Sequence, residues 1–130
     1  RVMRLVLDEL AASPAEPLHL PQPRDRRLAR ICAALMAEPG DNASLEEWAR
    51  RVGASARTLA RAFARETGMG FATWRQQARL AAALQRLAAG ASVTAVALDL
   101  GYASPSAFTA MFRRMLGTRP SDYFRPDYLR

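Results

Sequence analysis

Lysine is absent from this sequence, cysteine and histidine each occur once, and no apolar run approaches the roughly 18–20 residues that span a bilayer. The lone Cys32 excludes a disulfide framework and a cysteine-based zinc site, and its helical surroundings predict a buried, unreactive thiol. A single histidine, His19, is too little to build a metal site or a catalytic constellation. No carboxylate pair, glycine-rich phosphate loop or signal peptide is recognisable, so we expect no metal, no cofactor, no membrane association and no enzymatic activity.

Arginine supplies all 19 basic residues, against 12 acidic ones, and the formal net charge is +7. Half of the residues are apolar, mostly alanine and leucine with few β-branched runs, so we expect an all-α fold. The 130 residues are enough to bury a core without disulfides or metals. Such an excess of positive charge favours a polyanionic partner, nucleic acid before membrane.

Residues 44–68 have the pattern of a helix-turn-helix. Ser44 begins a capping-box pattern, Gly53 supplies a turn, and Ser55 is suited to cap a second helix. Shifting the chain by 48 residues aligns this stretch with a second copy at about residues 92–116, which contains one additional residue, and small, apolar and turn positions stay in register. The sequence therefore predicts two copies of a motif whose second helix lies in the major groove of DNA.

The outer face of the second helix in the first copy carries Arg57, Ala60 and Arg61, and the two arginines are the candidate base-reading residues. Arg57 and Arg61 lie one helical turn apart, and each guanidinium is able to donate two parallel hydrogen bonds to guanine O6 and N7. Arg65, one turn further along, is better placed for phosphate. The alternative is a merely solvated arginine face, but the preceding turn favours contact with bases or backbone.

The second copy has less base-reading chemistry, because no bidentate donor stands at the start of its second helix. Its groove-facing residues are predicted to be Ser106, Thr109, Ala110 and Arg113. The Phe and Met residues on the opposite face of this helix are predicted to be buried in the hydrophobic core and not to form a cofactor site. The predicted phosphate contacts of the two copies are Ser44, Ser55, Arg65, Ser104, Arg113 and Arg114. We therefore expect the first copy to read bases and the second mostly to anchor the protein.

The segments before the first copy have the pattern of a short helix followed by a linker. Residues 1–12 predict a short helix, either part of a core or a linker or dimerisation helix leaving an upstream domain. Residues 13–24 hold several prolines and predict an extended linker. Because the chain starts at Arg1 rather than methionine, we expect it to be a piece of a longer protein.

Residues 25–38 predict a helix capped by Asp25, with an arginine cluster outside that is either solvated or in contact with phosphate. Those arginines are Arg24, Arg26, Arg27 and Arg30. Residues 71–89 predict a connecting helix that buries Trp74 and turns its arginines away from the core. Those arginines are Arg75, Arg79 and Arg86. Its length of about 28 Å nearly matches the ~34 Å turn of B-DNA, which suits two recognition helices in adjacent grooves.

Residues 101–125, GYASPSAFTAMFRRMLGTRPSDYFR, resemble the end of the DNA-binding domain of the AraC/XylS family. Residues 45–80 are similar to that family's first helix-turn-helix and connecting helix. The resemblance implies a DNA-binding domain over residues 25–126, built from two helix-turn-helix subdomains joined by a long central helix. About seven helices are expected, besides the N-terminal linker helix.

Residue by residue, the resemblance implies base contacts at two sets of positions. They are Arg57, Ala60 and Arg61 in the first recognition helix, and Pro105, Ser106 and Ala110 in the second. Ala110 stands where many members carry arginine, which weakens the base reading expected of the second unit. Arg119 stands where a small residue is usual, and it predicts an added phosphate contact.

We therefore expect a sequence-specific, double-stranded DNA-binding regulator of bacterial transcription that reads adjacent major grooves, located in the cytoplasm at the nucleoid. RNA polymerase is an expected partner, and the resemblance implies an N-terminal effector-sensing and dimerisation domain that this sequence lacks. Activation and repression both remain open. The alternatives are a basic helical protein-interaction module and a non-specific DNA-binding protein.

Overall fold

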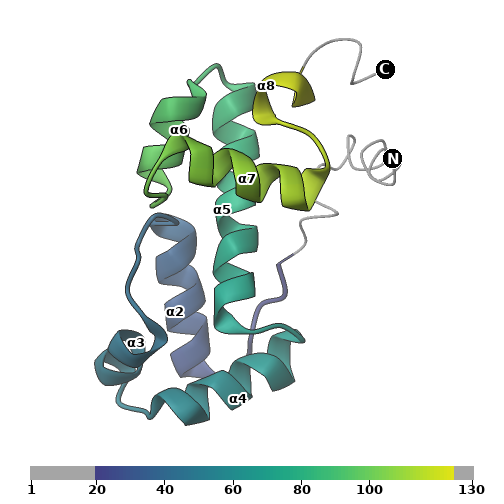
Figure 1. Cartoon of the computed structure of the whole chain (residues 1–130). Coiled ribbons are helices and arrows are strands. Elements are labelled where there is room, and N and C mark those ends of the chain that lie inside the picture. The colour runs from purple at the N-terminus through teal and green to yellow at the C-terminus, as the bar shows by residue number, and fades with distance from the viewer. Residues whose placement is uncertain (1–19, 125–130) are drawn as a thin grey trace. The chain divides into compact units, whose positions relative to one another are not determined.

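The structure is a computed structural model that describes residues 20–124. This part of the chain forms seven helices and no strand (Figure 1), which confirms the predicted all-α class. The helices are α2 (Arg26–Ala37), α3 (Leu45–Val52), α4 (Ala56–Thr67), α5 (Phe71–Ala88), α6 (Val93–Asp99), α7 (Pro105–Leu116) and α8 (Pro120–Tyr123). The helix predicted for residues 1–12 lies outside the described residues. Among the described helices, none combines the length and the hydrophobicity that a bilayer-spanning helix requires.

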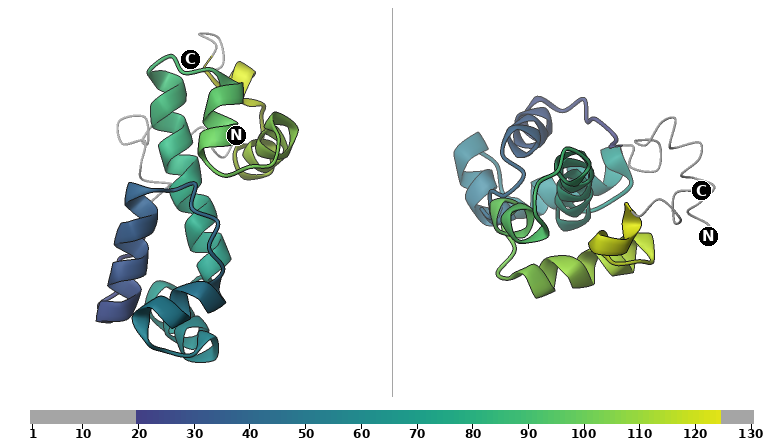
Figure 2. Two further views of the ribbon diagram at one scale, coloured as in Figure 1. Left: turned by 90° about the vertical axis from the view of Figure 1, so that its left-hand side faces the viewer. Right: turned by 90° about the horizontal axis from the view of Figure 1, so that it is seen from above.

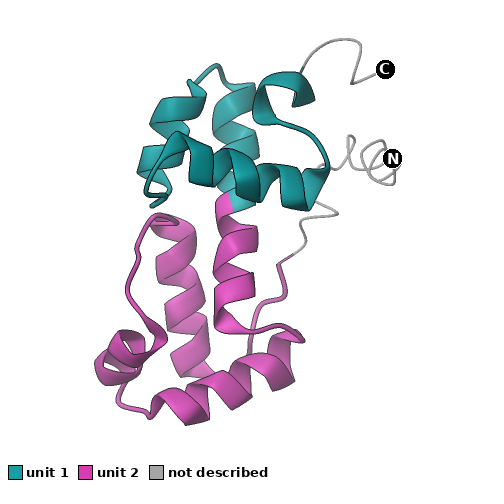
Figure 3. Ribbon diagram, viewed as in Figure 1, with its two compact units in different colours: residues 1–19, 80–130 teal, residues 20–79 magenta. Residues whose placement is uncertain are grey.

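The described chain divides into two compact units, each with its own helix-turn-helix (Figure 3). The N-terminal unit, magenta in Figure 3, comprises residues 20–79 and contains α2, α3, α4 and the first part of α5. The C-terminal unit, teal, contains the rest of α5 with α6, α7 and α8, in its described residues 80–124. The connecting helix thus belongs to both units, as its position between the two motifs predicts.

Serine caps start the helices of both motifs, as their sequence pattern predicts. Ser44 Oγ accepts the Glu47 N–H at 3.1 Å while the Glu47 carboxylate accepts the Ser44 N–H at 2.8 Å, which completes a capping box. The corresponding turn glycines adopt left-handed backbone, with φ of 72° at Gly53 and 84° at Gly101. Only glycine adopts this conformation without strain, so both turns sit where the sequence predicts them.

The core of the N-terminal unit lies between α2, α4 and the first half of α5. In two views α2 runs beside that half of α5, and α4 crosses their ends (Figures 1 and 2). Its fully buried side chains include Leu28, Ile31, Cys32, Leu35, Leu59, Phe63 and Trp74. Burial of the lone thiol and of the predicted inner face of α2 is thereby confirmed.

The prediction that Arg79 turns away from the core is wrong. Its side chain is 7% exposed, and its guanidinium donates to Pro39 O at 2.6 Å, Asp41 O at 3.0 Å and Asn42 Oδ1 at 2.8 Å. Arg75, one turn earlier, donates to Ala43 O at 2.7 Å. The loop between α2 and α3 has carbonyl groups that no helix ladder satisfies, and the two guanidinium groups provide the missing donors.

An aromatic chain forms much of the core of the C-terminal unit. Ring centroids lie 5.5 Å apart for Tyr102 and Phe108, 5.8 Å for Phe108 and Phe112, and 5.5 Å for Phe112 and Tyr123. Phe108, Phe112 and Met111 are buried, so the predicted core role of the Phe–Met stripe is confirmed. The stripe fixes one face of α7 inward and leaves the opposite face at the surface.

The segment that enters α2 packs on the N-terminal unit. Leu20 lies against its core, and Pro21 O accepts the Trp74 Nε1–H at 2.9 Å. Asp25 caps α2 as predicted, accepting the N–H groups of Arg27 and Leu28. The hydrogen bond from the Arg27 guanidinium lowers the pKa of the Asp25 carboxyl. The last residues of the predicted linker are therefore part of the folded unit.

Candidate nucleic-acid interface

The second helix of the N-terminal motif, α4, has one buried and one exposed face. Leu59, Ala62 and Phe63 point into the core. The predicted base-reading and phosphate residues of this helix all lie on the exposed side: Arg57, Ala60, Arg61 and Arg65. The structure thus brings these four together on one surface, and Ser55 caps the helix at the end where that surface begins.

Within residues 20–124, the guanidinium groups of Arg57, Arg61 and Arg65 form no ion pair or hydrogen bond. Other arginines are engaged. Arg51 lies 4.5 Å from the centroid of the Trp48 ring and 4.0 Å from Asp41 Oδ2. Arg27, Arg75, Arg79 and Arg119 are held by a carboxylate or by backbone carbonyls. The outer face of α4 therefore presents its charges ready for an external acceptor.

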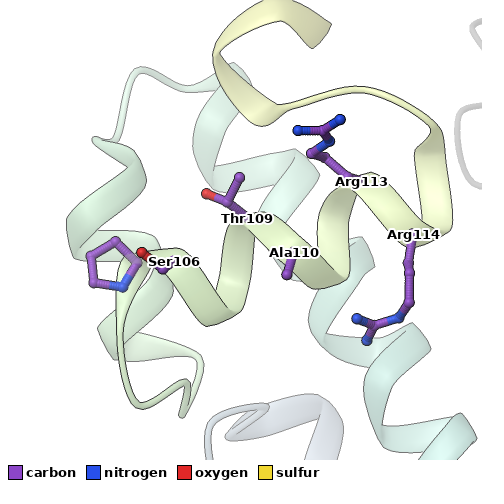
Figure 4. A pocket seen from close by; sticks show the side chains of 6 residues that line it. Ser106, Thr109, Ala110, Arg113 and Arg114 are labelled. Carbon is purple, nitrogen blue, oxygen red and sulfur yellow. The ribbon is translucent and has the colours of Figure 1, made fainter.

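The exposed face of α7 carries the predicted residues of the second motif. Six side chains line one open hollow of about 690 Å³ (Figure 4): Pro105, Ser106, Thr109, Ala110, Arg113 and Arg114. In this view the side chains of Arg113 and Arg114 leave the helix on opposite sides, with Thr109 and Ala110 between Ser106 and the two arginines. Charge is thus confined to the C-terminal half of the helix.

The remaining predicted phosphate contacts are the three cap serines and Arg119. Ser44, Ser55 and Ser104 each accept a backbone N–H, and Ser55 also donates to Thr58 Oγ1 at 2.9 Å. Within residues 20–124, Ser44 and Ser104 thus keep a hydroxyl proton to donate, whereas the exposed Ser55 hydroxyl must exchange its bond to Thr58 for one to a phosphate. The Arg119 guanidinium pairs with Asp122 Oδ2 at 2.9 and 3.0 Å, an exposed pair that contributes little and so can exchange for a phosphate.

Two positioning groups, Arg79 and Glu66, have no signal in the sequence. Arg79 holds the loop that leads into α3, and Glu66 Oε1 accepts the backbone N–H groups of Arg24 at 2.6 Å and Asp25 at 3.1 Å. Their partners are about forty residues away in the chain, so no local pattern indicates them. Among the described residues, no group of three His, Cys, Asp or Glu side chains is arranged to hold a metal ion.

Each unit thus presents the second helix of a helix-turn-helix with arginines on its free face, the arrangement that defines a DNA-binding domain. A family model described as a helix-turn-helix domain matches residues 48–126. The chain belongs to this family and is an AraC-type DNA-binding domain, a class of transcription-regulator domains and not of enzymes.

The curated relatives that the chain matches are transcriptional regulators. The transcriptional regulator NimR of Escherichia coli is 38% identical over 123 residues, which are 95% of this chain and 45% of that protein. RipA of Corynebacterium glutamicum is 38% identical over 122 residues, 94% and 35% of the two chains. The crystal structure of the AdpA DNA-binding domain in complex with a target DNA is similar, with a TM-score of 0.68 and 32% identity. The match covers 73% of this chain and 86% of that one. This chain spans less than half the length of the two curated relatives.

Proposed function

We propose that this chain binds double-stranded DNA sequence-specifically, with α4 and α7 each entering a major groove, and that it directs a bacterial transcription regulator to its sites. The observation that carries the proposal is the exposed pair Arg57 and Arg61, one turn apart near the start of α4. Recognition helices contact base edges with their N-terminal residues. The relative AdpA, whose DNA-binding domain is solved with a target DNA, supports this assignment.

Arg57 and Arg61 are the proposed base-reading residues. A guanidinium offers a planar pair of donors that matches guanine O6 and N7, and its charge adds to each bond. Ala60 lies between them on the same face, where its methyl group is suited to contact a thymine methyl. Arg65, one turn further along α4, is proposed to contact phosphate, with Ser44 and Ser55 at the helix starts.

The exposed face of α7 is proposed mainly to anchor the protein on DNA. Pro105, Ser106, Thr109 and Ala110 are assigned to the base edges, but none of them offers a charged bidentate donor. Phosphate contacts are assigned to Ser104, Arg113, Arg114 and Arg119. We therefore expect weaker sequence preference beneath α7 than beneath α4. The 18 residues of α5, about 27 Å of helix, suit a site that spans successive major grooves.

For the whole protein, we propose a cytoplasmic regulator associated with the nucleoid. The greater length of NimR and RipA supports the presence of further structure in the whole protein, which we propose to be an N-terminal domain that senses an effector and dimerises. RNA polymerase is the proposed protein partner.

The test is selection of bound duplexes from a random library with the whole 130-residue chain at near-physiological salt. Enrichment of a motif that spans two successive major grooves is the expected result. A motif confined to one groove would refute base reading by α7 and leave it an anchor. Binding without enrichment that fades as salt rises would indicate a non-specific binder, and no duplex binding would indicate a protein-interaction module.

A further inference from the structure

The N-terminal end of α2 carries an arginine cluster that the proposed base and phosphate contacts do not use. Arg24 and Arg26 are exposed there, and Arg30 lies one turn above Arg26 on the same face. Within the described residues, none of these three guanidinium groups is paired. We call Arg24 and Arg26, at the end of the helix, the α2 basic end.

The α2 basic end is fixed beside the recognition helix. Glu66, near the C-terminal end of α4, accepts the backbone N–H groups of both Arg24 and Asp25 through one carboxylate oxygen. In Figures 1 and 2, the N-terminal end of α2 meets α4, and the rest of α2 runs away from it. The two side chains of the basic end therefore start next to the last turns of α4, where the exposed Arg65 also lies.

The acidic groups nearby offset only part of this positive charge. Asp25 is paired with Arg27 at 3.1 Å and caps α2. Glu66 accepts two neutral backbone N–H groups, which leave its negative charge in place against the three positive charges of Arg24, Arg26 and Arg65. The arginines exposed at this end of the α2–α4 contact are Arg24, Arg26 and Arg65, which exceed the nearby acidic charge. A polyanion that continues past the groove complements such a surface.

We propose that Arg24 and Arg26 contact phosphates of the strand that borders the groove occupied by α4, and with Arg65 clamp the C-terminal end of that helix. The inference rests on the proposed DNA-binding function. A helix whose first turns reach base edges leaves its later turns near the sugar–phosphate backbone. The Glu66 hydrogen bonds hold the α2 basic end beside those later turns of α4. Because phosphate contacts carry no sequence information, the two arginines add affinity without adding specificity.

The experiment measures how the association constant depends on salt, for the wild-type chain and for R24A/R26A. Two probes are used: a duplex enriched by the wild-type chain, and a random-sequence duplex of equal length. The control is A33E/A37E, which changes the net charge equally on the exposed face of α2, about 10 and 17 Å further along the helix from Arg26. R24K/R26K keeps the charges and should keep binding. The Glu66 bonds use only the backbone N–H groups, so the alanine variant retains them.

The salt slope should fall by about 0.9 for each phosphate that the protein no longer neutralises, and so by nearly 2 for R24A/R26A. Affinity should drop by the same factor on both duplexes, the lysine variant should restore it, and the control should keep the wild-type slope. An unchanged salt slope in R24A/R26A, or an equal decrease of the slope in A33E/A37E, would overturn the inference. If the wild-type chain still selected its enriched duplex, the proposed function would stand in either case. A wild-type chain without duplex affinity would overturn both.

Discussion

The Nε–H of Arg79 on α5 donates to the carbonyl of Pro39 at 2.6 Å, a buried hydrogen bond to a residue forty positions earlier in the chain. The same side chain reaches Asp41 O and Asn42 Oδ1. The sequence predicts that Arg79 is exposed, but in the structure its side chain is buried and holds the loop leading into α3 against α5. α3, the first helix of the helix-turn-helix motif, begins at Leu45, directly after this loop.

Replacing Arg79 with methionine keeps the apolar stem but removes every donor. The buried carbonyl of Pro39 then loses the Arg79 donor, and the charged hydrogen bonds to Asp41 and Asn42 are lost with it, so the free energy of unfolding should fall by about 2–4 kcal/mol. Urea denaturation followed by circular dichroism measures the change. The same substitution at Arg86, half-exposed in the last turn of this helix, should cost less than about 0.5 kcal/mol. Equal effects at the two positions would contradict the bracing role.

Gly53 provides a second test, at the turn between α3 and α4. Its φ of 72° is strained for a residue with a side chain, yet an added Cβ would meet no atom within 4 Å. Gly53→Ala should therefore cost about 1 kcal/mol through the backbone alone. Gly53→Asn should cost less, because asparagine tolerates this conformation better. Thermal melting of the three proteins measures the order; a stabilised alanine variant would rule out the left-handed turn.

Cys32 should react slowly with thiol reagents because it is buried. The thiol is fully buried, and burial raises its pKa from 9.0 to about 12. The thiolate is the reactive form, so a disulfide reagent should react very slowly with the native protein, even at about pH 10, where an exposed thiol is ionised. The denatured protein should react at once. Rapid modification of the native protein at neutral pH would contradict the burial of α2 against the core.

Local chemistry explains how much of this molecule is predictable from its sequence. The Ser44 capping box and the Gly53 turn involve neighbours in the chain, so their residue types indicate them. Arg79 and Glu66 could not be predicted, because their partners are set by how α5 and α4 pack against distant segments. The arginines look alike in the sequence, and only packing separates the unpaired Arg57 from Arg51, which stacks on Trp48.

The central claim, that Arg57 and Arg61 read bases, is tested most directly by a binding panel. Affinities of the wild-type chain, Arg57→Ala and Arg61→Ala are measured on the enriched duplex and on each of its single-base variants, with Arg65→Ala as the control on the same helix face. Each of the first two variants should lose about 1–3 kcal/mol on the enriched duplex and become indifferent to the base at one position. Arg65→Ala should weaken binding to every duplex alike. Uniform losses for Arg57→Ala and Arg61→Ala across the panel would contradict the account and reduce α4 to a phosphate-binding helix.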